Sequence, residues 1–166
     1  MRNVRSLLAL STAVTAALVV AVTTAGPATA RGHSILREDL QGTFPLSDPV
    51  NASPVIAGVS PGGAPWVVDD NSEARVREDG RISVVVKHLV IPGRVPGNPI
   101  AMMAASLVCD DMVVDSTKAF AVSPEGNGQV TDRIRGTEDC DDPVVLVRNA
   151  SDPAALGAYF AFASAD

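Results

Sequence analysis

Histidine and cysteine, which carry much of the chemistry of enzymes and metal sites, are scarce in this chain of 166 residues. The only examples are His33, His88, Cys109 and Cys140. A zinc site usually needs three or four such ligands close together, and a catalytic thiol normally has a base beside it. The sequence also contains no phosphate-binding loop. It therefore predicts no metal site, no cofactor and no catalytic residues.

A surplus of positive charge is also missing. The chain has 13 Lys and Arg residues against 19 Asp and Glu, which gives a net charge of −6. Without a basic run, this composition argues against binding to nucleic acid or to anionic membrane surfaces. After residue 30, no apolar stretch reaches the roughly 18 residues that a transmembrane helix requires. We therefore expect neither nucleic acid nor a membrane among the partners of the mature protein.

The first 30 residues are typical of a secretory signal peptide. Arg2 and Arg5 form a basic start, residues 7–22 are an apolar run, and residues 28–30 are a small-residue cleavage site. Those two arginines are the only charged residues of the segment, so its removal changes the net charge from −6 to −8. An uncleaved anchor is the alternative, which the shortness of the apolar run disfavours. We expect a secreted, extracellular protein that is cleaved after Ala30.

An exported protein with two cysteines is expected to pair them. Disulfides persist in oxidising compartments, and an even number of cysteines suits pairing. The sequence therefore predicts a Cys109–Cys140 bridge that joins the end of a strand to a loop. Closing a loop of this length stabilises a fold by roughly 3–4 kcal/mol in the chain-entropy model.

Short strands separated by turn signals account for most of the remaining sequence. Their regular spacing, without alternating βα units, predicts an all-β fold, an antiparallel immunoglobulin-like β-sandwich of about eight or nine short strands. We expect residues 31–38 to be a flexible N-terminal tail and residues 39–166 to form a single β-sandwich domain. The expected strands are 39–46, 74–78, 81–86, 106–109, 112–115, 118–122, 129–135, 144–148 and 158–163.

Two tight hairpins organise this pattern. Asp79-Gly80 between two strands predicts a type I′ turn, and Asp110-Asp111 predicts a second tight turn. Residues 99–108 stay open between strand and helix, because Asn98-Pro99 could also begin a helix; we favour the strand. Residues 151–157 are expected to form at most one helical turn. In the last strand, alternation predicts Phe160 and Phe162 on one face.

Few residues are candidates for chemistry. Gly58-Val59-Ser60-Pro61-Gly62 matches the G-x-S-x-G pattern of a hydrolase elbow, but Pro61 lacks the required backbone amide and no helix can follow. We therefore interpret Ser60 as part of a plain turn. Trp66, the only tryptophan, ends a Pro/Gly loop. It is our one candidate for a ligand or partner contact, with plugging one end of the sandwich as the alternative.

The remaining polar candidates have structural interpretations. By alternation from Ile82, His88 should share the face of the buried valines of its strand. Asp132 should point inward and need backbone or arginine donors. Acidic clusters at 69–73, 110–111 and 138–142 lack the spacing of a calcium loop. We interpret these clusters as solvated surface charge, although the sequence leaves calcium binding open.

Six segments follow one another in a recognisable order: 61–66 (PGGAPW), 75–81 (RVREDGR), Asn98-Pro99, 107–109 (LVC), Ser123-Pro124-x-Gly126 and Cys140-x-x-Pro143. Their order resembles that in a group of small secreted actinomycete proteins of uncharacterised function, over most of residues 40–163. This likeness implies a secreted, β-rich fold and no known activity. A looser likeness is to the apoproteins that carry enediyne chromophores.

These observations favour a secreted, non-enzymatic β-sandwich protein with a binding or cell-envelope role. Its partner would be an unknown extracellular molecule or small ligand. A carrier of a small apolar ligand, of the chromophore-apoprotein type, is the alternative. It would need a pocket between the sheets lined by Met102, Met103, Phe160 or Phe162. An extracellular hydrolase that uses Ser60 is the least favoured interpretation.

Overall fold

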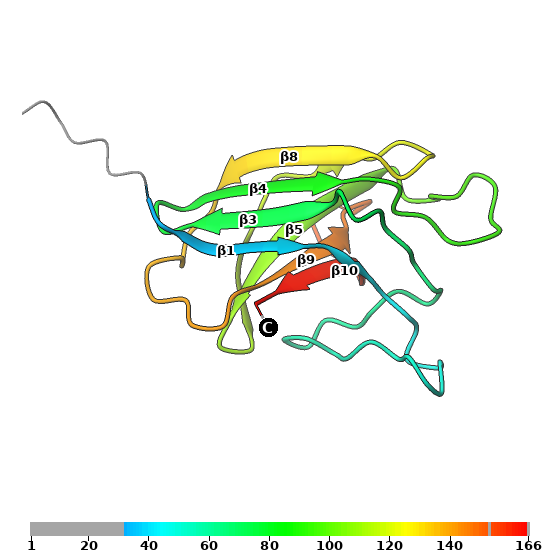
Figure 1. Ribbon diagram of the computed structural model, residues 1–166, viewed down its shortest axis with the longest axis horizontal. Coiled ribbons are helices and arrows are strands. Elements are labelled where there is room, and N and C mark those ends of the chain that lie inside the picture. Colours follow the sequence, from blue (N-terminus) through cyan, green and yellow to red (C-terminus); the bar gives the residue numbers. More distant parts are fainter. Residues whose placement is uncertain (1–31, 153, 166) are drawn as a thin grey trace, which may run out of the picture. The chain divides into compact units, whose positions relative to one another are not determined.

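The computed structural model describes residues 32–152 and 154–165, and they contain ten β-strands and no helix. The expected signal peptide lies outside these residues. Two antiparallel sheets pack face to face, which confirms the predicted β-sandwich (Figure 1). The strands are β1 (Ser34–Asp39), β2 (Gln41–Gly42), β3 (Glu73–Arg77), β4 (Arg81–Val86), β5 (Met102–Cys109), β6 (Met112–Ser116), β7 (Phe120–Ala121), β8 (Gly128–Arg133), β9 (Val144–Asn149) and β10 (Tyr159–Ser164).

The smaller sheet has the strand order β1-β3-β4-β8, with the β3–β4 hairpin at its centre. The larger sheet has the order β2-β10-β9-β5-β6, and β7 also pairs with β5. Figure 1 shows the four strands of the smaller sheet as one layer over β5, β9 and β10. The chain therefore passes between the sheets several times, and residues distant in sequence meet on each face.

Alternating apolar side chains from both sheets fill the space between them. On β4, Ile82, Val84 and Val86 point inward and are fully buried, whereas the residues between them are not. The facing residues Met103 of β5 and Val147 of β9 belong to the same core. Burial of one such side chain stabilises the fold by about 1.5–3 kcal/mol, so this core holds the two sheets together.

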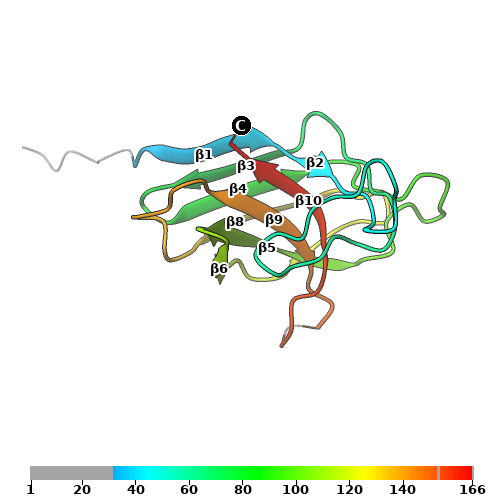
Figure 2. The same cartoon turned by 90° about the horizontal axis from the view of Figure 1, so that it is seen from below.

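The outer face of the larger sheet is also covered. Leu146 and Tyr159 form a second apolar cluster with Val59, which lies in the segment between β2 and β3. The Tyr159 hydroxyl donates a hydrogen bond to the Pro54 carbonyl oxygen, and burial raises the pKa of Tyr159 to about 12. Figure 2 shows this teal segment crossing the larger sheet. The larger sheet is therefore apolar on both sides.

The predicted disulfide is present. Cys109, the last residue of β5, is bonded to Cys140 in the loop between β8 and β9, with their Cα atoms 5.2 Å apart. This loop carries the chain from one sheet to the other. The bridge therefore ties a strand end to a crossover loop, as the sequence predicts.

Several details differ from the prediction. The expected flexible tail 31–38 is wrong from residue 34 onward, because β1 begins at Ser34 and pairs with β3. Residues 39–46 form only the end of β1 and the short β2. The described part of 151–157 forms bends and a turn, which agrees with the prediction of at most one helical turn. Phe160 and Phe162 lie on opposite faces, since the register of β10 shifts between Tyr159 and Ala161.

One of the two hairpin turns differs from the prediction, and the tight turn predicted at Asp110-Asp111 is confirmed. The link between β3 and β4 has three residues, Glu78 to Gly80, and of these only Gly80 has a positive φ (80°). It is therefore not a type I′ turn but matches a type I turn followed by a left-handed glycine. In the β5–β6 turn, Asp110 and Asp111 both have positive φ (50° and 57°), which is the type I′ pattern.

Candidate anion-binding face

The outer face of the smaller sheet is polar and open, unlike that of the larger sheet. Strands β3 and β4 bury Ala74, Val76, Ile82 and Val84, so the residues between these positions point outward. These outward positions are rich in arginine. We call the five side chains on this face the arginine track: Arg37, Arg75, Arg77, Arg81 and Arg133.

Strand register places the arginine track in one continuous line. Arg37 of β1 is paired with Arg75 of β3, and Arg81 of β4 is paired with Arg133 of β8. Arg77, two residues beyond Arg75 on the same face of β3, precedes the turn that leads to Arg81. Because β1 and β8 are the two edges of this sheet, the track crosses the sheet from edge to edge.

Three of these arginines make contacts within the protein. Arg37 forms an exposed ion pair with Glu73 at 3.4 Å. The Arg77 Nε donates to the Gly32 carbonyl oxygen at 3.1 Å and lies 3.9 Å from Asp79 Oδ1. An exposed pair such as Arg37–Glu73 contributes about 0–1 kcal/mol. The Arg77 side chain is half-buried, and its contacts hold it in place.

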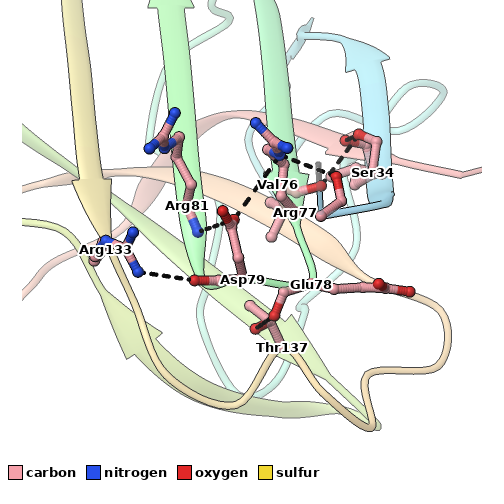
Figure 3. Close-up of polar contacts among 10 residues, drawn as sticks. Ser34, Val76, Arg77, Glu78, Asp79, Arg81, Arg133 and Thr137 are labelled. Carbon is pink, nitrogen blue, oxygen red and sulfur yellow. Dashed lines mark hydrogen bonds and ion pairs between the residues drawn. The ribbon is translucent and has the colours of Figure 1, made fainter. Parts of the chain in front are cut away.

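The turn between β3 and β4, which lies beside the arginine track, supports it further (Figure 3). The Asp79 carbonyl oxygen accepts a hydrogen bond from Arg133 Nη1 at 3.3 Å, while its carboxylate accepts one from the Arg81 backbone amide at 3.2 Å. The Glu78 carbonyl oxygen accepts from the Thr137 hydroxyl at 2.9 Å. The turn is thus fixed by both its own residues and the β8–β9 loop.

Arg75 and Arg81 have no such partners. Within residues 32–152 and 154–165, neither guanidinium forms a hydrogen bond or an ion pair, and both residues are exposed. They line a shallow pocket of about 290 Å³ at the centre of the face, whose other lining residues are Glu73, Arg77, Ser83 and Thr131. A guanidinium offers five N–H donors in a planar fork that matches carboxylate and phosphate groups. The pocket can therefore bind an anion.

This face is positive although the protein is acidic. Its five arginines compare with Asp39 and Glu73 on the same face and Asp79 in the adjacent turn. The formal charge of the whole chain is −6. This feature could not be predicted from the sequence, because the arginines are spread over residues 37–133 and only strand pairing brings them together. The R-x-R spacing of Arg75 and Arg77 in a predicted strand was the one available signal.

Trp66, the sequence candidate for a partner contact, is buried. Only 3% of the residue is exposed, and its ring packs on Phe160 with the ring centroids 4.4 Å apart. The Trp66 amide also donates to the Thr43 carbonyl oxygen at 2.7 Å. Trp66 therefore closes one end of the apolar core and offers no side-chain surface to a ligand, which corrects its assignment as a contact residue.

Ser60 and His88 are not brought together as a catalytic pair. The Ser60 carbonyl oxygen accepts a hydrogen bond from the Tyr159 amide, and the next segment is held along β10 by Gly62. The prediction for His88 is wrong: β4 ends at Val86, and His88 is exposed with φ of 52°. Leu89 takes the buried position instead. No hydrogen bond joins Ser60 to His88 in the described part of the chain.

The acidic candidates serve as hydrogen-bond acceptors or lie at the surface. Asp132 is half-buried and accepts from the backbone amides of Lys118 and Arg133, both at 2.9 Å, as the sequence predicts for backbone donors. Hydrogen bonding from these two amides, that of Lys118 first, lowers the pKa of Asp132. No cluster of three or more His, Cys, Asp or Glu side chains that could hold a metal ion occurs among the described residues.

A second, apolar pocket lies beneath the loop that follows β4. Its volume is about 600 Å³. The polar groups at this pocket are His88, Arg94 and Glu125. The expected lining of an inter-sheet pocket is not here: Met103 and Phe160 are buried in the core at 0% and 5% exposure. The apolar lining residues are Val67, Val90, Ile91, Pro92, Val95, Pro96 and Pro124.

Comparison with known proteins gave no match to a family model, to a curated protein sequence or to a solved structure. In the part of the chain that the structure describes, no helix is long and apolar enough to cross a membrane.

Proposed function

We propose that this chain is a secreted, non-enzymatic binding protein that recognises an anionic extracellular ligand through the arginine track. The mature protein would begin at Arg31, after removal of the signal peptide. The observation that carries the proposal is the pair Arg75 and Arg81, two exposed guanidinium groups on the central strands of an open sheet face, without partners among the described residues.

The difference between the outer faces of the two sheets supports this proposal. The larger sheet is covered on its outer side by the segment that contains Val59, whereas the smaller sheet presents its polar side to solvent. Five like charges on adjacent strands repel one another unless an anion binds between them. An apolar ligand or a partner that fills a groove gains nothing from this arrangement, but an anion does.

Retention on a cation-exchange matrix tests the proposal. A protein with a net charge near −8 after signal removal should pass through a phosphate-bearing matrix at pH 7, unless one face binds the fixed anions. We expect the mature protein to be retained at low ionic strength and released by moderate salt, because salt screens exposed charges. Arg75→Gln together with Arg81→Gln should abolish retention.

The matched control is Arg94→Gln, which removes one exposed arginine from the loop at the opposite end of β4. It should be retained as the wild-type protein is. Passage of the wild-type protein through the matrix at low salt, or equal retention of the double variant, would contradict the proposal.

A small apolar-ligand carrier is a second candidate function, supported by the pocket near Ile91 and Val95. Its volume of about 600 Å³ is within the range of small-molecule sites, roughly 300–1,000 Å³. A mostly apolar lining with a few polar groups is also typical of such sites. The pocket is at the loop end of the molecule, and the ligand would bind there rather than between the sheets.

A further inference from the structure

The arginine track has a regular geometry that limits the shape of its ligand. Neighbouring strands are about 4.8 Å apart, and successive outward residues on one strand are about 6.6–6.8 Å apart. The steps from Arg37 to Arg75, from Arg75 to Arg77 and from Arg81 to Arg133 therefore each measure roughly 5–7 Å at the backbone. A ligand that uses the whole track must carry its negative charges at a similar repeat.

The track is also open at both ends. Arg37 is on the edge strand β1 and Arg133 is on the edge strand β8. The central pocket is a shallow depression between them. A compact anion would fill the pocket alone, whereas a linear chain could cross the sheet and continue past both edges. The arrangement therefore favours a polymer over a small molecule.

The uncharged groups on this face indicate the chemistry of that polymer. The hydroxyl groups of Ser83 and Thr131 are 3.3 Å apart, beside Arg75 and Arg81 at the central pocket. They can donate to or accept from sugar hydroxyls. Outward positions of the described strands of this sheet hold no aromatic residue. Aromatic stacking is the usual device for binding single-stranded nucleic acid, so a nucleic acid fits this face poorly.

The acidic residues beside the track set an upper limit on the charge density of the ligand. Glu73 pairs with Arg37 and lines the central pocket, and Asp39 is paired with Glu73 across the strands. These carboxylates would repel a polymer with several charges in each unit. A polymer with one carboxylate per sugar reduces this repulsion, and each carboxylate matches the fork of one guanidinium.

We propose that the arginine track binds a linear acidic polysaccharide that carries one carboxylate per sugar. This inference depends on the proposed function, since it names the ligand of the same face. The carboxylates pair with Arg75, Arg77 and Arg81, while Ser83 and Thr131 hydrogen-bond to hydroxyl groups of the sugars between them.

Isothermal titration with polygalacturonate tests this inference. We expect binding at low salt that Arg75→Gln together with Arg81→Gln weakens by about tenfold or more. The double variant Arg75→Lys with Arg81→Lys keeps the charge but loses the fork, and it should fall between these two proteins. Arg94→Gln should bind as the wild type does. Circular dichroism and thermal unfolding of each variant establish that the fold is retained.

Three further probes separate the possible outcomes. Neutral dextran should not bind, and heparin and single-stranded DNA should bind more weakly than polygalacturonate. If DNA or heparin binds as well or better, the named polymer is wrong but the anion-binding function stands. If the protein is retained on the phosphate matrix but does not bind polygalacturonate, the named polymer is again wrong and the anion-binding function again stands. Absence of binding to every anion overturns both proposals.

Discussion

Thr43 is a residue whose chemistry conflicts with its surroundings. It is fully buried, and its hydroxyl has no hydrogen-bond partner among the described residues. A buried hydroxyl that loses its hydrogen bonds to water costs roughly 1–3 kcal/mol. Valine has nearly the same shape and no such cost. We expect Thr43→Val to raise the free energy of unfolding by about 1 kcal/mol, measured by urea denaturation.

Ser106→Ala provides the contrast, because the buried Ser106 hydroxyl is hydrogen-bonded to Ser116 at 2.7 Å. This variant should be less stable than the wild type. A Thr43→Val protein that is also destabilised would show that the Thr43 hydroxyl contributes an interaction in solution.

At the level of single residues, sequence reasoning worked where one local rule decides the outcome. Cys109 and Cys140 are an example, because pairing requires only two cysteines and an oxidising destination. It failed for His88, because alternation was extended past Val86, where the strand ends. It also left Trp66 ambiguous, since burial of a loop aromatic depends on Phe160, which is distant in sequence.

The β5–β6 turn requires a backbone conformation that is unfavourable for its two residues. Asp110 and Asp111 both adopt the left-handed region, which is costly for residues with a Cβ atom. Glycine adopts that conformation without penalty. We expect Asp111→Gly to stabilise the protein by about 0.5–1 kcal/mol, seen as a higher melting temperature.

The opposite substitution at the other hairpin is the control. Gly80 has φ of 80°, and a Cβ atom there would lie 2.5 Å from the Ile134 carbonyl oxygen. Gly80→Ala should therefore lower the melting temperature. If Asp111→Gly is also destabilising, the aspartate carboxylate makes a contribution that outweighs the backbone strain.

Strands with one buried face have a clear period of two in the sequence, whereas strands with two buried faces do not, although the strands favoured at 99–108 and predicted at 144–148 are confirmed as β5 and β9. β4 alternates strictly, and its bounds match the prediction. In contrast, seven of the eight residues of β5 are buried, so its sequence has no period of two and also fits a helix. The faces of Phe160 and Phe162 in β10 could not be predicted for another reason. A bulge at Phe160 reverses the alternation of the strand, and no sequence rule locates a bulge.

At the scale of the whole molecule, the class of fold could be predicted but the candidate site could not. The spacing of turns is a local property, and it predicted a sandwich. The arginine track depends on which strands are neighbours, and Arg37, Arg75 and Arg133 meet only through long-range pairing. Net charge was also misleading, because it averages over faces that have opposite charge.

Two carboxylates join the sheets along the open side of the sandwich. Asp132 of β8 accepts a hydrogen bond from the Lys118 amide near the larger sheet. Asp115 of β6 accepts one from the Arg135 amide, which follows β8, and forms an ion pair with the Arg135 side chain at 3.2 Å. Each sheet thus provides a carboxylate that binds backbone near the other, and these polar contacts help to hold this side of the sandwich together.

This arrangement predicts a loss of stability in acid. Partial burial raises the pKa of Asp115, but hydrogen bonds from the Arg135 and Ser116 amides outweigh burial and lower it overall. The pKa of Asp132 is lowered by the Lys118 and Arg133 amides. A carboxyl group with a lowered pKa in the folded state stabilises the fold above its unfolded pKa of about 3.9. That contribution is lost as the pH falls through the folded-state pKa.

Unfolding measured from pH 7 to pH 2.5 tests this prediction. The double variant Asp115→Asn with Asp132→Asn should be less stable than the wild type at pH 7, by about 1 kcal/mol for the pair, because water screens both groups. The difference should shrink as the pH falls below the unfolded-state pKa of about 4 and through the lowered folded-state pKa values of the two carboxyl groups. Asp70→Asn is the control, since the Asp70 carboxylate accepts no hydrogen bond among the described residues. If the stability of the double variant falls as steeply in acid as that of the wild type, groups other than Asp115 and Asp132 cause the acid sensitivity.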